Sequence, residues 1–92
     1  MKVQHETEDQ RGLFFIEKEK KRIARMFYNK PTAKLIVIEH TEVDDVQKGN
    51  GIGKQLIEAA VDFARKKEVR IVPFCPYAKK ILTETEAFKD VL

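Results

Sequence analysis

The pattern of side chains predicts two β-strands in the first third of the chain. Residues 12–16 read GLFFI, which is rich in the aromatic and β-branched residues that favour a half-buried strand. Residues 22–28 read RIARMFY, which places Ile23 and Phe27 on one face of an extended chain and Met26 and Tyr28 on the other. The charged run EKEKK between them is predicted to be a turn, so the two stretches form a β-hairpin.

The segment KLIVIEHTEV predicts a central strand over residues 35–43. Its unbroken apolar run from Leu35 to Ile38 is typical of a strand that is covered on both faces. The preceding NKPTA is predicted to be a second turn, because Pro31 fixes its own φ and biases Lys30 towards extended geometry. The strands up to about residue 43 should form an antiparallel meander, and the N-terminus has room for one further strand.

Apolar residues at helical spacing follow, beginning near Ile52. The helical stripe consists of Ile52, Leu56, Ala59, Ala60, Phe63 and Ala64. The helix should end at RKKE, where cations complement the C-terminal dipole. The segment VRIVPFC then predicts another strand, in which Pro73 indicates an edge or a bulge. Pro76 suits the first position of a short second helix.

The predicted order is therefore β-β-β-α-β-α. A strand, a helix and a further strand imply a right-handed crossover, which makes the strands at 35–43 and 69–75 parallel. We expect an α/β (α+β) fold with a mixed, mostly antiparallel sheet, in one small domain over residues 1–92.

Composition and charge indicate which cellular compartment and which kinds of partner to expect. The single cysteine, Cys75, cannot form an internal disulfide, which fits a reducing compartment. Neither a signal peptide nor a run of about 18 apolar residues occurs, so we expect a cytoplasmic protein with no membrane contact. The net charge of +3 comes from basic clusters interrupted by glutamates, without interleaved aromatics, which disfavours a nucleic-acid partner. Two separated histidines and one cysteine lack the spacing of a metal site.

Three glycines, Gly49, Gly51 and Gly53, lie between the central strand and the helix. The first amides of a helix have no intrahelical partner and attract anions, and glycine permits both φ > 0 and a close approach of phosphate. A flexible turn without a ligand is the alternative. Two familiar phosphate loops are excluded by spacing. A P-loop needs four residues between its glycines where Gly49 and Gly53 have three, and a dinucleotide fingerprint needs glycine where Leu56 stands.

The stretch KGNGIGKQLIEAAVDFA closely resembles the hallmark of the GNAT superfamily of acyl-CoA N-acyltransferases. That hallmark is Arg or Gln, two residues, Gly, one residue, and Gly or Ala, at the start of the helix after the central strand. Lys48, Gly51 and Gly53 match it, with lysine at the Arg/Gln position. The segments IEHTEV and IVPFCPYAKKIL also resemble short GNAT-like proteins whose last strand ends in Cys-Pro or Cys-Ser. The resemblance therefore covers about residues 24–82, and like that short branch this chain lacks the helices that full-length enzymes insert between their first two strands.

This resemblance implies that the chain binds acetyl-CoA. The pyrophosphate of coenzyme A would lie on the amides of residues 48–54, and the pantetheine arm would lie like an extra strand beside the end of the central strand. The implied cofactor-binding residues are Thr41, Glu42, Val43, Lys48, Gly49, Asn50, Gly51, Ile52, Gly53, Lys54, Cys75 and Tyr77. A solvated role explains Lys48 and Lys54 equally well, and Lys79 and Lys80 are secondary candidates for the 3'-phosphate.

The family's reaction needs a base, a donor for the oxyanion and an acid. The resemblance implies that a backbone amide near Glu42 or Val43 polarises the thioester. Larger GNAT enzymes carry the motif Asn, two residues, Ala, then Tyr four later. Aligned on Ala78, this motif places Cys75 at the asparagine and Leu82 at the tyrosine, so the usual acid is absent.

Two side chains remain as catalytic candidates. Cys75, just before a helix that would lower its pKa from about 8.5, could be a nucleophile, an acid or a small buried residue beside pantetheine. His40, with a reference pKa of about 6.5, could be the general base or a histidine held structurally. Strict alternation would place His40 on the face of Ile38 and Glu42. Tyr77 is a further candidate acid.

The sequence therefore predicts an acetyl-CoA-dependent N-acetyltransferase that acts on an amine and works as a monomer. The acceptor amine could belong to a metabolite or to a protein. The alternative is a non-catalytic module that binds acyl-CoA.

Overall fold

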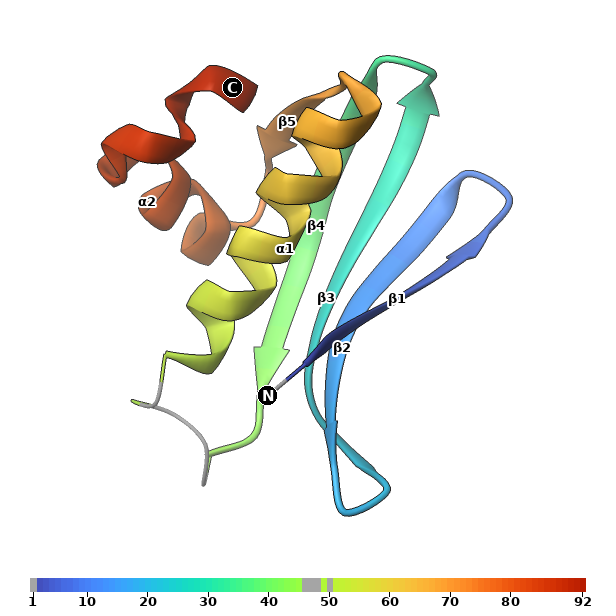
Figure 1. Cartoon of the computed structure of the whole chain (residues 1–92), viewed down its shortest axis with the longest axis vertical. Helices are drawn as coiled ribbons and strands as arrows, with labels where there is room; N and C mark the ends of the chain where they lie inside the picture. The colour runs from blue at the N-terminus through green and yellow to red at the C-terminus, as the bar shows by residue number, and fades with distance from the viewer. Residues whose placement is uncertain (1, 46–48, 50) are drawn as a thin grey trace.

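One sheet with helices packed on it makes up the fold. The computed structural model describes residues 2–45, 49 and 51–92. In chain order, its elements are β1 (Val3–Glu8), β2 (Arg11–Lys18), β3 (Lys21–Thr32), β4 (Leu35–Val43), α1 (Ile52–Lys67), β5 (Arg70–Pro73), α2 (Pro76–Glu84) and the 3-10 helix η2 (Glu86–Val91). The five strands form one sheet in the order β1-β2-β3-β4-β5 (Figure 1).

The predicted topology is confirmed. Strands β1 to β4 form an antiparallel meander that includes the further N-terminal strand. Strand β5 is parallel to β4, from the pair Leu35–Arg70 to the pair Ile38–Pro73, and α1 makes the crossover between them. The fold is therefore α/β (α+β) with a mixed, mostly antiparallel sheet, as expected. The 3-10 helix at the C-terminus was not predicted.

Both predicted turns are shorter in the structure. Only Glu19 and Lys20, with φ of 54° and 65°, separate β2 from β3, so EKEKK is mostly strand. Strand β3 continues through Pro31 to Thr32, so the second turn consists of Ala33 and Lys34 and most of NKPTA is strand. Proline is tolerated there because the pairing of β3 with β4 is irregular between Asn29 and Thr32.

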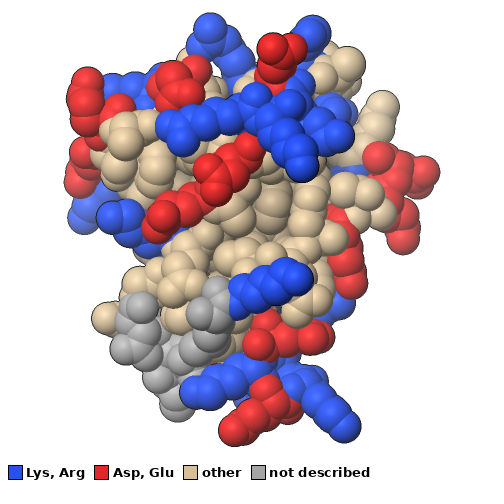
Figure 2. Space-filling view, viewed as in Figure 1, with Lys and Arg blue, Asp and Glu red and all other residues tan. Residues whose placement is uncertain are grey.

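The helices and the sheet enclose one core, on the side of the sheet that we call the helix face. The sheet contributes Phe14, Ile16, Ala24, Met26, Tyr28, Ile36, Ile38 and Ile71, and the helices contribute Leu56, Ile57, Ala60, Val61, Ala64, Ala78 and Leu82. The buried stripe of α1 is wider than predicted, because Ile57 and Val61 belong to it. At the upper end of α1, Arg65, Lys66 and Lys67 complement the helix dipole, among side chains of both charges (Figure 2).

The opposite side of the sheet, the open face, has no helix over it in the part of the chain that the structure describes. Leu35 and Val37 of β4 are half-buried there, while Ile36 and Ile38 are fully buried on the helix face. The expectation that β4 is covered on both faces is therefore wrong. Phe15 is buried on the open face because the guanidinium of Arg22 lies 3.9 Å from its ring centroid.

A β-bulge in β4 decides which side chains meet at the end of this strand. Phe27 pairs with His40, but Tyr28 pairs with Ile38, so Glu39 is one residue more than β3 can match. Neighbouring residues of β3 point to opposite faces, so Ile38 and His40 do as well. The prediction that they share a face is wrong, because alternation along a sequence does not reveal a bulge.

An aromatic cluster fastens β1 to the helix layer. The ring of His5 stacks on Phe14 with centroids 4.1 Å apart, and its Nε2 lies 2.6 Å from the Tyr28 hydroxyl. Phe63 of α1 meets the His5 ring edge-on at 4.8 Å. Gly12 is required beneath this cluster, because a Cβ there would lie 2.1 Å from the Tyr28 ring. Burial lowers the pKa of His5 and raises that of Tyr28.

We expect this cluster to make the protein less stable in mild acid. The folded state lowers the pKa of His5, so the unfolded state binds more protons and stability is lost as pH falls from about 6.5 through the folded pKa. Urea unfolding of the unmodified protein and of His5→Phe, at about pH 7.5 and about pH 5, measures this. The unmodified protein should lose more free energy of unfolding over that interval. An equal loss in both proteins would contradict this role of His5.

Candidate functional site

The end of β4 offers a backbone edge with no partner strand on one side among the described residues. Strand β5 ends at Pro73, and the amides of Phe74 and Cys75 both donate to the carbonyl of Ile38 at 3.0 Å, so the chain turns away from β4 there. Beyond Ile38, one side of β4 therefore lies beside a gap in which β5 no longer pairs with it.

The bulge decides which amides point into this gap. The amide of Asp44 donates to the Ile23 carbonyl of β3 at 2.8 Å. Backbone groups of successive residues in a strand point to opposite edges, so Asp44 and Glu42 face β3 while Val43 and Thr41 face the gap. The side chains of Thr41 and Val43 lie on the helix face, as their pairing with Met26 and Ala24 requires.

The N-terminus of α1 faces the same gap. Gly51 is its N-cap in the left-handed conformation, with φ of 72°, and no side chain caps the first turn. The first α-helical bond of this turn runs from the Gln55 amide to the Gly51 carbonyl, so the amides that precede Gln55 in the helix lack an intrahelical acceptor. Gly49 also has positive φ, 87°, and both glycines would direct a Cβ into open space. This combination is typical of a site for an anion.

Gly53 has a different role from the other two glycines. A Cβ at Gly53 would lie 2.1 Å from the hydroxyl of Tyr77, so the absent side chain makes room for the tyrosine that begins α2. Burial, and to a lesser degree the nearby charge of Cys75, raise the pKa of the Tyr77 hydroxyl, which therefore stays protonated at neutral pH.

Cys75 lies behind the cleft rather than in its wall. It is the N-cap of α2, is only 6% exposed, and its Sγ lies 3.6 Å from Thr41 Oγ1. Burial acts to raise the pKa of the thiol. Hydrogen bonds from the Ala78 backbone, the Thr41 hydroxyl, the Tyr77 backbone and the Thr41 backbone outweigh it, so that the net pKa is lowered.

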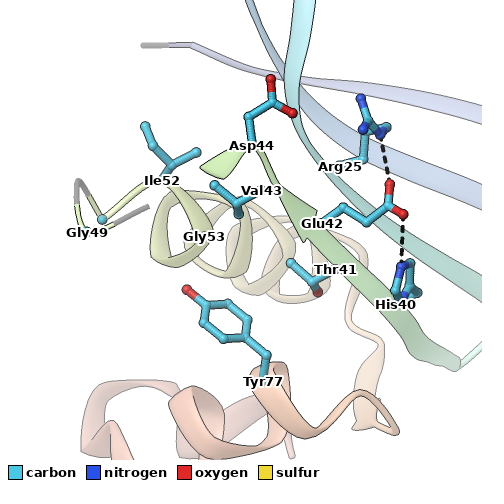
Figure 3. Close-up of a pocket in the computed structure, with 11 residues that line it drawn as sticks. Arg25, His40, Thr41, Glu42, Val43, Asp44, Gly49, Ile52, Gly53 and Tyr77 are labelled. Carbon is cyan, nitrogen blue, oxygen red and sulfur yellow. Dashed lines mark hydrogen bonds and ion pairs between the residues drawn. The ribbon is translucent and has the colours of Figure 1, made fainter. Parts of the chain in front are cut away.

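Three charged or titratable side chains form a chain of contacts on the open face. Arg25 Nε lies 3.0 Å from Glu42 Oε1, and Glu42 Oε2 lies 3.1 Å from Nε2 of His40 (Figure 3). The hydrogen bonds from Arg25 and His40 lower the pKa of Glu42, which is therefore ionised at neutral pH. The far side of the His40 ring faces Phe27, with centroids 6.3 Å apart.

These features surround one cleft of about 770 Å³, a size suited to a small-molecule ligand. Its lining consists of Arg25, His40, Thr41, Glu42, Val43, Asp44, Gly49, Gly51, Ile52, Gly53 and Tyr77 (Figure 3). The cleft therefore joins the edge of β4, the N-terminus of α1 and the first turn of α2. Among the described residues, no three His, Cys, Asp or Glu side chains form a group that could hold a metal ion.

The structure brings most of the predicted site residues to this cleft. Lys48 and Asn50 lie outside the described residues. Lys54 is exposed and does not line the cleft, and neither do Lys79 and Lys80. Sequence reasoning missed Arg25, because only the register of β3 against β4 places it opposite Glu42. The alternation of β3 could have indicated it, since it shares a face with Phe27.

Comparisons with known proteins identify the family. A family model described as GCN5-related N-acetyl-transferase matches residues 13–91. An NMR structure of a GCN5-like protein from Staphylococcus aureus is 30% identical, with a TM-score of 0.74 over 96% of this chain and 85% of that one. The chain therefore belongs to the GCN5-related N-acetyltransferases, the GNAT family.

Other similar proteins match a smaller share of their own length. Protein NATD1 from Bos taurus is 34% identical and that from Homo sapiens 33%, each over 61 residues. Each match covers 66% of this chain and 54% of the relative, so the chain spans about half the length of these proteins. A GNAT family acetyltransferase from Elizabethkingia anophelis with acetyl-CoA bound shares the fold, with 18% identity and a TM-score of 0.62 over 70% of this chain and 42% of that one.

The contact between Gly53 and Tyr77 predicts that Gly53→Ala has opposite effects on stability when Tyr77 is present and when it is replaced by alanine. Gly53→Ala should destabilise the protein by about 1–3 kcal/mol, because the new Cβ displaces the tyrosine ring. In the Tyr77→Ala background, the same change should stabilise by about 0.5–1 kcal/mol, as alanine does in a helix. Urea unfolding of the four proteins gives both values. Equal effects in the two backgrounds would contradict the packing described.

Proposed function

We propose that this protein is an acetyl-CoA-dependent N-acetyltransferase that transfers an acetyl group to an amine. The observation that carries the proposal is the position of two sets of backbone donors around one cleft. The free edge of β4 lies on one side and the uncapped N-terminus of α1 on the other. The GNAT family membership and the acetyl-CoA-bound neighbour support this use of the cleft.

The two donor sets suit different parts of coenzyme A. The amides of Gly49, Gly51, Ile52 and Gly53 would bind the pyrophosphate, with Lys48, Asn50 and Lys54 as further proposed contacts. Thr41 and Val43 would pair with the amides of pantetheine as an added strand would. Glu42 directs its backbone to β3, so we assign the amide that polarises the thioester to Val43 rather than to Glu42.

His40 is our proposed general base. It lines the cleft on the open face, and Glu42 accepts a hydrogen bond from its Nε2 when that nitrogen is protonated. The carboxylate, itself held by Arg25, would stabilise the imidazolium that forms when Nδ1 takes a proton from the attacking amine. The amine then forms the new bond to the acetyl carbon while the bond to sulfur breaks.

The departing thiolate needs a proton, and two residues are candidates. Tyr77 lines the cleft and stays protonated at neutral pH. Cys75, with its lowered pKa, reaches the cleft only through the hydroxyl of Thr41. The geometry favours Tyr77 as the proton donor. Cys75 would then act through Thr41, either by passing a proton to the Thr41 hydroxyl or by orienting that hydroxyl.

A non-catalytic acyl-CoA-binding module is the second candidate function. One observation favours it: Leu82, at the position where the larger enzymes carry a catalytic tyrosine, is fully buried in the core. We further propose that residues 1–92 form one domain that acts as a cytoplasmic monomer, with an amine acceptor and without a nucleic-acid partner. No helix within the described ranges is long and apolar enough to cross a membrane.

Acetyl-CoA should stabilise the protein strongly if it occupies this cleft. At a concentration of 100 times Kd, stabilisation of about 2.7 kcal/mol corresponds to a rise of roughly 10–20 °C in Tm. The side chain of Gly51→Val would enter the cleft and should abolish the rise, whatever its effect on the protein alone. Free coenzyme A should act similarly and ATP less. The absence of any shift in the unmodified protein would remove the cofactor from the proposal.

A turnover assay distinguishes the two candidate functions, an acetyltransferase and a non-catalytic binding module. Incubation with acetyl-CoA and a panel of amines should release thiol above the hydrolysis blank. His40→Gln should lower kcat by about 10²–10⁴-fold and keep the thermal shift, because a general base contributes that much. His5→Gln is the matched control, since His5 does not line the cleft, and it should leave kcat unchanged.

The same assay ranks the two candidate acids. We expect Tyr77→Phe to lower kcat more than Cys75→Ala does, because only Tyr77 lines the cleft. The reverse order, with binding intact, would assign the proton transfer or a covalent step to Cys75. Thiol release equal to the blank for every amine, with the thermal shift present, would establish the binding module instead.

A further inference from the structure

One row of side chains crosses the open face from β1 to the cleft. The strand register pairs Glu6 with Leu13, Leu13 with Phe27, and Phe27 with His40, so these four residues follow one another on the same face. Adjacent strands lie about 4.8 Å apart, which puts Leu13 about 10 Å from His40 and Glu6 about 14 Å from it. The row therefore begins at the proposed base and crosses the open face to the edge strand β1.

A second cavity lies along this row. It has a volume of about 390 Å³ and is lined by Glu6, Thr7, Glu8, Arg11, Gly12, Leu13 and Phe27. Phe27 and Leu13 are both half-buried, so each presents apolar surface to solvent. The Phe27 ring also faces the His40 ring with an interplanar angle of 22°. Phe27 thus connects the second cavity to the cleft.

The side chains along this row change from apolar to charged at β1. Glu6 and Glu8 of β1 and Arg11 at the start of β2 also line the cavity, and Glu6 is already paired with Arg22 at 2.8 Å. Two apolar side chains, Phe27 and Leu13, lie between this charged rim and His40. The surface therefore matches a chain that is apolar over about 10 Å and polar beyond it.

We propose that the acceptor is a primary amine on an unbranched apolar chain that lies over Phe27 and Leu13. Its amine is at His40, and its far end carries a polar group at the rim of Glu6 and Glu8. This inference rests on the proposed function and names its substrate class. Leu13 and Phe27 determine chain-length specificity and take no part in the chemistry. A half-buried methylene raises kcat/KM by roughly twofold.

Linear alkylamines from propylamine to octylamine test the chain-length dependence. The value of kcat/KM should rise roughly twofold per methylene until the chain reaches Leu13, and then level off. Leu13→Gln should remove the rise for the longer amines and leave propylamine unchanged. Val72→Gln is the matched control, because Val72 is 41% exposed on the open face beside Val37, away from the row. A flat dependence on chain length, or equal effects of the two variants, would overturn the inference.

A binding measurement keeps this inference separate from the proposed function. Octylamine titrated into the complex with free coenzyme A should shift the NMR resonances of the Leu13 methyls and the Phe27 ring, and not those of Val72. Unshifted Leu13 resonances would overturn the inference even if short amines are acetylated. Shifted resonances without thiol release from any amine would support this surface as the amine site and contradict the proposed catalysis.

Discussion

The extra residue that β4 carries at Glu39 is the constraint on which the candidate site depends. Up to Ile38, β4 is an interior strand with partners on both sides. The bulge reverses the alternation, and β5 turns away at the same level because the amides of Phe74 and Cys75 both bind the Ile38 carbonyl. Without the bulge, the side chains of Thr41 and Val43 would lie on the open face. With it, they lie beside α1, and their backbone groups face the gap.

The same bulge separates two chemical environments along one strand. The helix face receives Thr41, behind which lie the buried thiol of Cys75 and the contact of Tyr77 with Gly53. The open face receives His40 and Glu42, where Arg25 fixes the carboxylate. The backbone donors therefore lie near Cys75 and Tyr77, and the chain of Arg25, Glu42 and His40 lies on the opposite face of β4. That is the arrangement that a transfer from a thioester to an amine needs, with the two substrates approaching from different sides.

Local pattern was sufficient to predict the order of elements, the parallel pair and the helix that begins at Ile52, because each depends on short-range periodicity or on the chirality of a crossover. It was insufficient for the bulge, for the continuation of β3 through Pro31, and for the open face, because pairing between distant segments decides all three. The three glycines of the pattern line the cleft, but the pattern did not distinguish the roles of these glycines. Gly51 has positive φ, whereas Gly53 makes room for Tyr77. Arg25 was missed since its partner lies 17 residues away.

Amide hydrogen exchange tests the central claim most directly, namely that the bulge turns alternate amides of β4 towards coenzyme A. In the free protein, the amide of Glu42 should be protected by β3, while that of Val43 should exchange fast. Added coenzyme A should slow exchange at Thr41, Val43 and the first turn of α1, and leave Glu42 unchanged. Protection of Val43 in the free protein, or no slowing at Val43 when coenzyme A binds, would contradict the account.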